Sequence, residues 1–232
     1  SMIEMVEIPE KNRRTLCVSS QAGCALQCTF CATGAQGFEK DLTSDEIIGQ
    51  LWLANFHKKN KDLITNVVFM GMGEPLLNFD AVVESAKIMK HQLAYGLSRK
   101  RVTISTSGIV PQIDKLADSV DVSLAISLHS ADDSLRDEIV PINKKYPINS
   151  LINSCKNYLL NYDNKRNITI EYILIDGVND SIGHAKQLSK LLANISCKIN
   201  LIPFNKFDGC EYKRPSNNKI SGFKDFLMKK GY

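Results

Sequence analysis

The sequence has no long apolar run, no large excess of one charge and no secretory signal. No segment approaches the roughly 18 consecutive apolar residues that a membrane-spanning helix requires. Residues 1–10 lack the apolar stretch of a signal peptide. Low-complexity tracts, internal repeats and an obvious interdomain linker are also missing. These absences argue against a membrane protein or a secreted protein and predict a cytoplasmic one.

What is present is the composition of an ordinary globular protein. The chain has 232 residues, 44% hydrophobic and 23% charged, which is enough to bury one core in one domain. The net charge of +4 permits contact with nucleic acid without requiring it. Basic groups occur at residues 13–14, 99–101, 144–145 and 213–214, and each alone is more typical of a solvated surface. The charge of the chain therefore does not identify its binding partner.

The seven cysteines do not form the pattern of a disulfide scaffold. Their number is odd, and the chain is far larger than the small secreted domains that depend on disulfides. Three of them also lie within a single short loop. A reducing compartment fits this usage better than an oxidising one.

That loop carries the strongest chemical signal in the sequence. Cys24, Cys28 and Cys31 have the spacing Cys-x3-Cys-x2-Cys, and thiolates favour zinc, Cu(I) and iron–sulfur clusters. A closed zinc site or an ordinary four-iron cluster needs four ligands, and no fourth Cys or His lies at a short regular spacing. A four-iron cubane held by three cysteines keeps one iron free for a small molecule. The alternative is that the three are buried as small hydrophobic residues, which their crowding between Gly23 and Gly34 disfavours.

Strand patterns alternate with helix patterns along the chain, which predicts a parallel sheet with right-handed crossovers. The expected strands cover residues 15–19, 66–70, 101–106, 122–128, 168–175 and 198–203. The expected helices cover residues 43–56, 79–91, 112–118, 132–139, 150–161, 180–194 and 216–230. Thr43 and Glu46 form a capping box at the start of the first helix. Its apolar face is expected to contain Ile47, Ile48, Leu51, Trp52 and Phe56.

Polar and glycine residues follow each expected strand. The first strand leads into the cysteine loop. The others end at Gly71, Gly73 and Glu74, at Ser105, Thr106 and Ser107, at Ser127 and His129, at Asp176 and Gly177, and at Asn205. Because sites in parallel α/β folds form at the carboxyl ends of strands, these residues predict one shared pocket. The two glycines before Glu74 allow close approach and positive φ, and its carboxylate suits an ammonium group. Each of these residues alone also has an ordinary structural interpretation. His129 could be a histidine at a strand end with its hydrogen bonds made within the protein, Ser105 a residue of the strand ladder, and Asn205 a turn former.

The string at residues 23–34, Gly-Cys-Ala-Leu-Gln-Cys-Thr-Phe-Cys-Ala-Thr-Gly, resembles the cluster loop of radical S-adenosylmethionine (SAM) enzymes. It is most similar to the RNA adenine-C2 methyltransferases of the RlmN/Cfr type. The likeness continues through residues 71–75, 105–108, 127–129 and 203–205, and so covers essentially the whole chain.

This resemblance implies an α/β fold, a partial (β/α)6 barrel of the radical SAM type with parallel strands. It implies a four-iron, four-sulfur ([4Fe-4S]) cluster on Cys24, Cys28 and Cys31. The matching SAM contacts are Gly73, Glu74, Ser105, Ser127, Leu128, His129 and Asn205. It also implies reductive cleavage of SAM to a 5′-deoxyadenosyl radical, with an external electron donor such as a flavodoxin-type protein. The substrates it implies are 23S rRNA and tRNA, methylated at C2 of adenine through a methylated cysteine.

The family's cysteine machinery is matched only in part, and two of its segments have no match here. Cys17 matches the second cysteine, which resolves the covalent adduct, although a buried strand cysteine is an equally good interpretation. The methyl-carrying cysteine belongs to a segment after the last helix, and Cys155, Cys197 and Cys210 lie in the wrong context for it. The family's N-terminal accessory domain has no match either. We therefore interpret residues 1–232 as the radical SAM core of a longer enzyme, unable by itself to complete methyl transfer.

Two other functions remain open at this point. A radical SAM enzyme of another class would methylate C8 of adenine, or act on a peptide or a small metabolite. The second possibility is a non-catalytic binding or electron-transfer protein with a metal site. Electron transfer, however, favours four cysteine ligands and does not need polar groups at every strand end.

Overall fold

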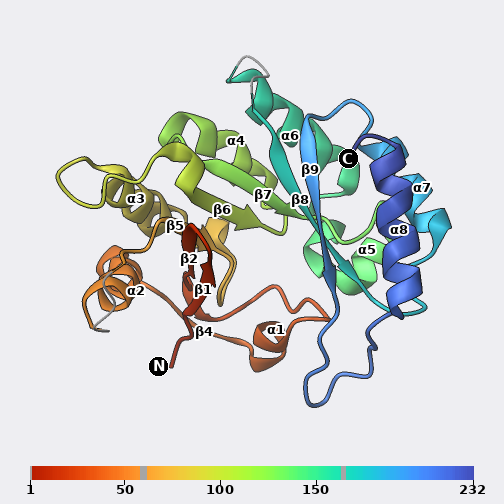
Figure 1. The fold of residues 1–232 in the computed structure, drawn as a ribbon, viewed down its shortest axis with the longest axis horizontal. Coiled ribbons are helices and arrows are strands. Elements are labelled where there is room, and N and C mark those ends of the chain that lie inside the picture. The colour runs from red at the N-terminus through yellow and green to blue at the C-terminus, as the bar shows by residue number, and fades with distance from the viewer. Residues whose placement is uncertain (1, 58–61, 163–165) are drawn as a thin grey trace.

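The computed structural model describes residues 2–57, 62–162 and 166–232 (Figure 1). Its main sheet has seven strands in the order β1-β2-β5-β6-β7-β8-β9. These strands are β1 Val6–Glu10, β2 Arg13–Cys17, β5 Asn66–Phe69, β6 Val102–Thr106, β7 Ser123–Ser127, β8 Ile168–Leu174 and β9 Cys197–Pro203. β1 is antiparallel to β2, and every other neighbouring pair is parallel. The six predicted parallel strands are confirmed.

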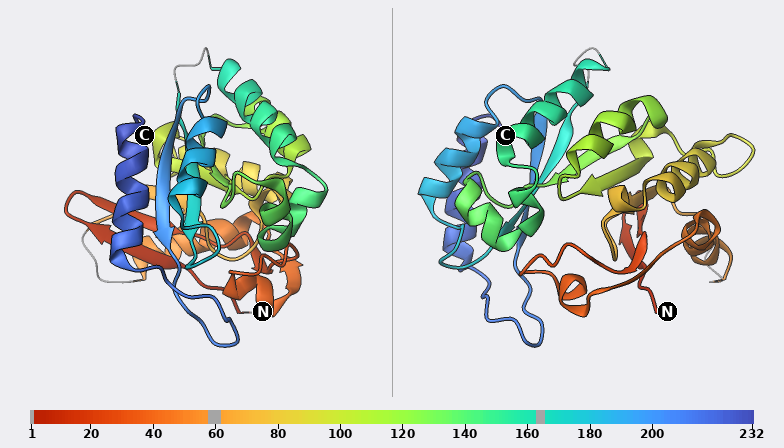
Figure 2. Two further views of the ribbon diagram at one scale, coloured as in Figure 1. Left: turned by 90° about the vertical axis from the view of Figure 1, so that its right-hand side faces the viewer. Right: turned by 180° about the vertical axis from the view of Figure 1, so that it is seen from behind.

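The sheet curls into a half-barrel with helices on its outer face (Figures 1 and 2). The helices are α2 Ser44–Phe56, α3 Phe79–Lys90, α4 Val110–Ser119, α5 Asp133–Ile139, α6 Ile148–Leu160, α7 Ile182–Leu191 and α8 Asn217–Lys229. They agree with the predicted helices apart from small shifts at their ends, so the partial (β/α)6 barrel is confirmed. Within the described ranges, no helix is long and apolar enough to cross a membrane.

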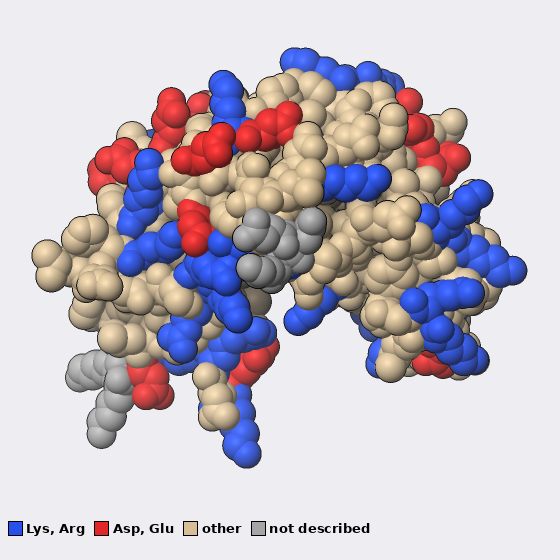
Figure 3. Space-filling view, turned by 90° about the horizontal axis from the view of Figure 1, so that it is seen from above, with Lys and Arg blue, Asp and Glu red and all other residues tan. Residues whose placement is uncertain are grey.

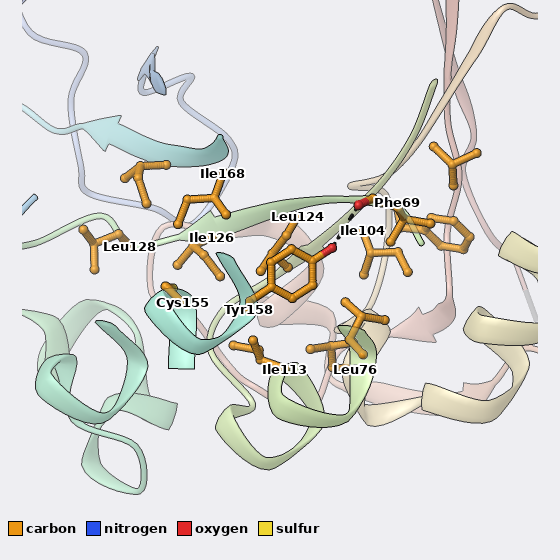
Figure 4. Packing of buried hydrophobic residues seen from close by; sticks show 14 of the residues in the cluster. Phe69, Leu76, Ile104, Ile113, Leu124, Ile126, Leu128, Cys155, Tyr158 and Ile168 are labelled. Atoms are coloured by element: carbon orange, nitrogen blue, oxygen red, sulfur yellow. Dashed lines mark hydrogen bonds between the residues drawn. The ribbon is translucent and has the colours of Figure 1, made fainter. Parts of the chain in front are cut away.

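The hydrophobic core lies between the sheet and the outer helices. Figure 4 shows Ile104 of β6 and Leu124 of β7 beside Ile113 of α4 and Tyr158 of α6. All four side chains are buried. The Tyr158 hydroxyl donates a hydrogen bond to the carbonyl of Val122 at 2.9 Å, so its one polar atom is satisfied inside the core.

The edge strand β1 was not expected from the sequence. Its residues Val6 and Ile8 are 51% and 46% exposed, so the strand lacks the buried face that produces a clear apolar pattern. It also contains Pro9, which cannot donate to a strand ladder and is tolerated at a sheet edge. A small second sheet, β3 Gln21–Gly23 paired with β4 Phe38–Asp41, and the short helix α1 Ala32–Gln36 were likewise not expected.

The predicted apolar face of α2 is wrong at its aromatic residues. The capping box of Thr43 and Glu46 is present, but Trp52 and Phe56 are 53% and 59% exposed. Polar Gln50 and Asn55 are buried on this helix instead. Gln50 bonds both main-chain groups of Ser19, and Asn55 accepts from the amide of Ile64. The buried face of α2 therefore contains two polar side chains that satisfy main-chain groups, and the two aromatic residues lie outside it.

Candidate functional site

A cavity of about 250 Å³ lies at the carboxyl ends of the parallel strands. The cysteine loop forms part of its wall, and residues of β5, β6, β7, β8 and β9 or of the turns that follow them form most of the rest. The predicted site residues that line it are Cys24, Cys28, Cys31, Gly73, Glu74, Ser105, Ser127 and His129. The structure thus brings residues far apart in the sequence to a single cavity.

The cysteine loop is closed at its base by main-chain contact. Gly23 has φ 74, and a Cβ added there would lie 1.8 Å from the carbonyl oxygen of Gly37. The amide of the next residue, Cys24, donates to that same oxygen at 2.9 Å. Only glycine allows the two strands β3 and β4 to approach this closely at the point where the loop begins.

The middle of the loop is held by two other parts of the chain. The amide of Thr29 donates to the carbonyl of Ile139 at the end of α5, at 3.2 Å. The Thr29 hydroxyl is 3.0 Å from the hydroxyl of Tyr212, which belongs to the segment between β9 and α8. Within the loop, the amide of Cys31 donates to the carbonyl of Cys28 at 3.1 Å. The cysteines therefore sit on a main chain with fixed anchors on both sides.

The thiols of this loop are free and electrostatically coupled. Burial raises the pKa of Cys24, and burial together with the smaller effects of the neighbouring thiols and Glu74 raises the pKa of Cys28 to about 12. In the described part of the chain, no three His, Cys, Asp or Glu side chains converge on one metal ion. The cysteine ligands of a cubane bind different irons, so they need not converge in this way.

Glu74 ties two strand ends together. It is 2% exposed, and its carboxylate accepts from the amide of Leu76 at 3.0 Å and from the amide of Ser107 at 2.7 Å. Its own amide donates to the side chain of Gln21 at 2.8 Å. Burial raises the pKa of its carboxyl group. Both carboxylate oxygens are thus engaged: the bond to Leu76 fixes the turn after β5, and the bond to Ser107 joins that turn to the end of β6.

The glycines before Glu74 permit close packing, as expected. A Cβ on Gly71 would lie 2.8 Å from the main-chain carbon and oxygen of Val18. Gly73 has φ 98, and a Cβ there would lie 2.5 Å from the side chain of Gln21. The close approach is to the chain after β2, so these glycines shape the cavity wall.

Arg136 of α5 is a completely buried arginine that holds the rim on the other side. Its guanidinium donates to the carbonyls of Leu128 at 2.9 Å, Ser107 at 2.6 Å and Ser127 at 3.1 Å, and to the side chain of Asn143 at 2.8 Å. Burial lowers its pKa to about 10, so it remains charged at neutral pH. One side chain thus fixes the ends of β6 and β7.

His129 joins the end of β7 to β8. Its ring Nδ1 accepts from the amide of Ile173 at 3.1 Å, and its carbonyl accepts from Asn179 at 2.9 Å. The ring meets Phe30 of the cysteine loop edge-on, with centroids 4.7 Å apart. Burial lowers the pKa of His129 to about 3, so the ring is neutral and carries its proton on Nε2. Its φ of 61 is unusual for a residue other than glycine, as is common at functional sites.

Sequence comparison identifies the family. The Radical SAM superfamily matches residues 18–188, about three quarters of the chain. The chain belongs to the radical SAM superfamily. It is 56% identical over 237 aligned residues to the dual-specificity RNA methyltransferase RlmN of Pseudomonas entomophila, and 54% identical to that of Pseudomonas fluorescens. The alignments cover 100% of this chain and 62% of each relative, so the chain spans less than two thirds of these curated relatives.

Two solved structures have the same architecture. A radical SAM methyltransferase from Sphaerobacter thermophilus superposes with a TM-score of 0.94 at 42% identity, covering 99% of this chain and 67% of that one. SuiB from Streptococcus suis superposes with a TM-score of 0.66 at 14% identity, covering 94% of this chain and 48% of that one, a likeness of fold alone.

Radical SAM proteins use a [4Fe-4S] cluster and SAM, and the cavity has a suitable donor set. Three free thiols lie on one wall, and polar groups from β6, β7 and β8 lie around them. No fourth cysteine or histidine ligand belongs to the loop, which suits a cluster with one open iron.

Some predicted residues of the radical SAM site lie outside the cavity wall. Leu128 is buried behind it, with its carbonyl held by Arg136, and Asn205 is exposed in the segment after β9. Cys17 is half-buried on β2, with its thiol against the main chain of Met70, which does line the cavity.

The expectation that every strand end contributes polar groups to one pocket is wrong for Asp176 and Gly177. Asp176 pairs with Lys219 of α8 at 2.8 Å and does not line the cavity. The side chain of Asn179 accepts from the amide of Ile175 at 2.8 Å and donates to the carbonyl of Ile173 at 2.7 Å. These bonds fold the chain back at the end of β8, so the residues after it turn away from the cavity.

The sequence analysis also missed two contributors, Arg136 and Glu171. The sequence does not indicate that Arg136 is buried, because an arginine in a short helix normally faces solvent. Glu171 did carry a signal: it is the one charged residue within the strand Ile-Thr-Ile-Glu-Tyr-Ile-Leu. It is 5% exposed and lines the cavity.

Proposed function

We propose that this chain is the radical SAM core of an enzyme that methylates C2 of adenine in 23S rRNA and tRNA. The observation that carries the proposal is the combination of free Cys24, Cys28 and Cys31 on one cavity wall with 56% identity to RlmN along the whole chain. An adenine-C8 methyltransferase, or a radical SAM enzyme acting on a peptide or a small metabolite, is the alternative.

In this proposal Cys24, Cys28 and Cys31 hold the cluster. The residues proposed to hold SAM are Gly73, Glu74, Ser105, Ser127, Leu128, His129 and Asn205. When bound, the cluster and SAM supply the one-electron chemistry that C2 of adenine requires, because that carbon lies between two ring nitrogens and is too electron-poor to attack a sulfonium methyl. The contribution of the protein is to bind, orient and exclude water.

The protonation states of the residues that line the cavity fit these roles. Burial holds Cys24 and Cys28 as thiols at neutral pH, so cluster assembly releases protons from them and is favoured by higher pH. His129 is neutral and can donate from Nε2 to a polar group of the ligand. Glu74 keeps both oxygens on main-chain amides, so it orients the Gly71–Glu74 turn as well as supplying negative charge.

Cys17 is proposed as the cysteine that resolves the covalent adduct. Burial raises the pKa of its thiol to about 11, so it is protonated at neutral pH and needs a base before it can act as a nucleophile. Its neighbour Met70 lines the cavity, which puts the thiol next to the reaction space without exposing it there.

The proposed RNA partner is supported by the surface charge. In Figure 3, Lys and Arg side chains gather on both sides of a hollow, as suits a polyanion. Not every predicted basic residue is available for this, since Arg14 is largely buried and bonds Glu7. The proposal also includes a flavodoxin-type electron donor and a cytoplasmic location, where both RNA substrates are found.

The cluster assignment is tested by anaerobic reconstitution with iron and sulfide. We expect about four irons per chain, and 5′-deoxyadenosine once SAM and a reductant are added. Cys28→Ala should lose the cluster, whereas the matched control Cys197→Ala, a half-buried thiol outside the cavity, should keep it. Retention of the four-iron spectrum by Cys28→Ala would contradict the assignment.

The RNA assignment is tested by binding. We expect tRNA and a 23S rRNA fragment to bind this chain with an affinity that falls steeply as salt rises. An absence of binding at low salt would argue for a peptide or a small metabolite as the substrate.

A further inference from the structure

Arg136 of α5 is a buried positive charge without a directly paired negative charge in the protein. Its side chain is completely buried, and its hydrogen bonds go to three carbonyl oxygens and one side-chain amide oxygen. Among the described residues no carboxylate forms an ion pair with it. A buried charge is costly unless an opposite charge balances it, and neutral oxygens balance it only in part. An anion is therefore expected close to Arg136.

Two aspartates of the same helix are separated from this guanidinium by Asn143. The side-chain oxygen of Asn143 accepts from Arg136 at 2.8 Å, and its side-chain nitrogen donates to Asp133 at 2.9 Å and to Asp137 at 2.6 Å. Asp133 is exposed and Asp137 is partly exposed, so solvent screens both charges. The aspartates orient Asn143 and leave most of the buried charge unbalanced.

The other side of Arg136 faces the cysteine loop and the cavity wall. The amide of Thr29, the residue after Cys28, donates to the carbonyl of Ile139, one turn beyond Arg136 on α5, at 3.2 Å. Two of the carbonyls that Arg136 holds belong to Ser107 and Ser127, which line the cavity. Arg136 therefore lies behind the wall of the cavity that the three cysteines also line.

Arg136 and Cys28 act on each other electrostatically. Burial lowers the pKa of Arg136 to about 10, and the charge of Cys28 is the largest of the electrostatic effects in the opposite direction. Burial raises the pKa of Cys28 to about 12, and the charge of Arg136 acts to lower it. Such an interaction is weakly screened because both groups are buried. The loop thus provides the anion that Arg136 lacks once its cysteines are thiolates.

The charge of the cluster makes this interaction depend on its oxidation state. Three thiolates outweigh the positive charge of an oxidised four-iron core, so the bound cluster is an anion. Reduction adds one electron, supplied by the one-electron donor of the proposed function, and adds no proton. The reduced cluster is therefore more negative, and a fixed cation stabilises it more than the oxidised one. Net charge is among the properties that set the potential of iron–sulfur clusters.

We propose that the buried charge of Arg136 raises the reduction potential of the cluster held by Cys24, Cys28 and Cys31. The inference rests on the proposed function, which supplies the cluster and its reductant. Arg136 does not line the cavity, so it acts through its charge and not by touching a reacting group. Its ties to the strand ends hold that charge at a constant distance from the loop.

The test is an anaerobic redox titration of the reconstituted chain, followed by electron paramagnetic resonance of the reduced cluster. Arg136→Gln removes the charge and keeps an amide donor. We expect the ratio of reduced to oxidised cluster at a given potential to fall at least about tenfold, which is a shift of about 59 mV for a one-electron couple. Arg136→Lys keeps the charge but not the planar set of donors, so it should lower stability and leave the potential close to that of the unmodified protein. A potential lowered equally by both substitutions would show a purely structural role and overturn the inference.

A second variant shifts the potential in the opposite direction without touching Arg136. Asp137→Asn removes a negative charge that acts on the guanidinium, and its amide oxygen can still accept from Asn143. We expect a higher potential, by less than the shift of Arg136→Gln because Asp137 is partly exposed. The matched control is Glu138→Gln, the same loss of charge at the next, exposed residue, which should leave the potential unchanged.

These variants keep the inference testable if Arg136→Gln does not take up the cluster. In that case, a potential of Asp137→Asn no higher than that of Glu138→Gln overturns the inference. Equal potentials for Arg136→Gln and the unmodified protein, both with intact clusters, overturn this inference alone. An unmodified chain that takes up no four-iron cluster overturns the proposed function, and the inference with it.

Discussion

The two sides of the cavity rim are held by different physical means. On the side of the cysteine loop and β5, main chain packs directly on main chain at Gly23 and Gly71, which leave no room for a Cβ, and Glu74 adds a single side-chain tie to β6. On the side of β7 and β8, side chains make the ties, with Arg136 holding three carbonyls and Asn179 bonding the main chain of β8 and His129. The comparison shows that a rim can be fixed either by removing side chains or by burying polar ones.

The largest expected effect comes from breaking the side-chain ties. Arg136→Leu removes four hydrogen bonds and leaves the carbonyls of Ser107, Ser127 and Leu128 buried without this donor. We expect the free energy of unfolding to fall by about 3–5 kcal/mol, measured by chemical denaturation. Arg13→Leu, at an exposed arginine paired with Glu10, is the control and should change stability by less than about 1 kcal/mol. Similar losses for both variants would refute the special role of Arg136.

The next effect comes from crowding the main-chain side. Gly71→Ala puts a Cβ 2.8 Å from main-chain atoms of Val18, which cannot move as a flexible side chain can. We expect a loss of at least about 2 kcal/mol, together with weaker SAM binding, because the turn that carries Glu74 is displaced.

The control for this variant is Gly49→Ala in the middle of α2. A Cβ there meets nothing within 4 Å, and alanine is favoured over glycine in a helix by about 0.5–1 kcal/mol. The control should therefore be stabilised in the same thermal or chemical unfolding experiment. If Gly71→Ala were as stable as the Gly49→Ala control, the packing account of this side of the rim would be wrong.

These two sides also differ in how well the sequence predicted them. Three cysteines at this spacing are typical of a metal-binding loop. Two glycines before a glutamate are typical of a tight turn. The cysteine loop and the Gly71–Glu74 turn were therefore found. The parallel strands were found because both their length and their alternation with helices are visible in the apolar pattern.

The side-chain ties could not be predicted in this way. Arg136, Asn143 and Asn179 are ordinary surface residue types, and their burial depends on contacts between segments distant in the sequence. The same reason explains the wrong assignment of Trp52 to the core. Only the folded chain shows that the buried face of α2 contains Gln50, which satisfies the main chain of Ser19. Tertiary hydrogen bonding decided each of these cases.

A smaller effect, which depends on pH, isolates His129 on the side-chain side. Its pKa is about 3 when folded and about 6.5 when unfolded, so the unfolded chain binds the proton first as the pH falls. Its contribution to stability is therefore present above pH 6.5 and is lost between pH 6.5 and 3, at up to about 1.4 kcal/mol per pH unit. Glu74 and Glu171, whose pKa values are raised, act in the opposite direction on acidification.

The measurement is therefore a difference between two proteins. His129→Asn keeps a side chain that tolerates positive φ but does not titrate, so its stability should fall less steeply below pH 6.5 than that of the unmodified protein. His91→Asn, with an exposed histidine, should follow the unmodified protein. Parallel pH profiles for all three proteins would show that the buried ring of His129 is not the titrating group.

The smallest expected effect separates crowding from backbone strain on the main-chain side. Gly37 has φ 79 and ψ −179, a conformation that essentially only glycine adopts, yet a Cβ there meets nothing within 4 Å. Gly37→Ala should therefore cost about 1 kcal/mol through strain alone, less than Gly71→Ala, and the carbonyl that accepts from Cys24 should stay close to its position. Iron content after reconstitution should remain near that of the unmodified protein. A loss of iron equal to that of Cys28→Ala would show that the base of the cysteine loop depends on the conformation of Gly37 as strongly as on its packing against Gly23.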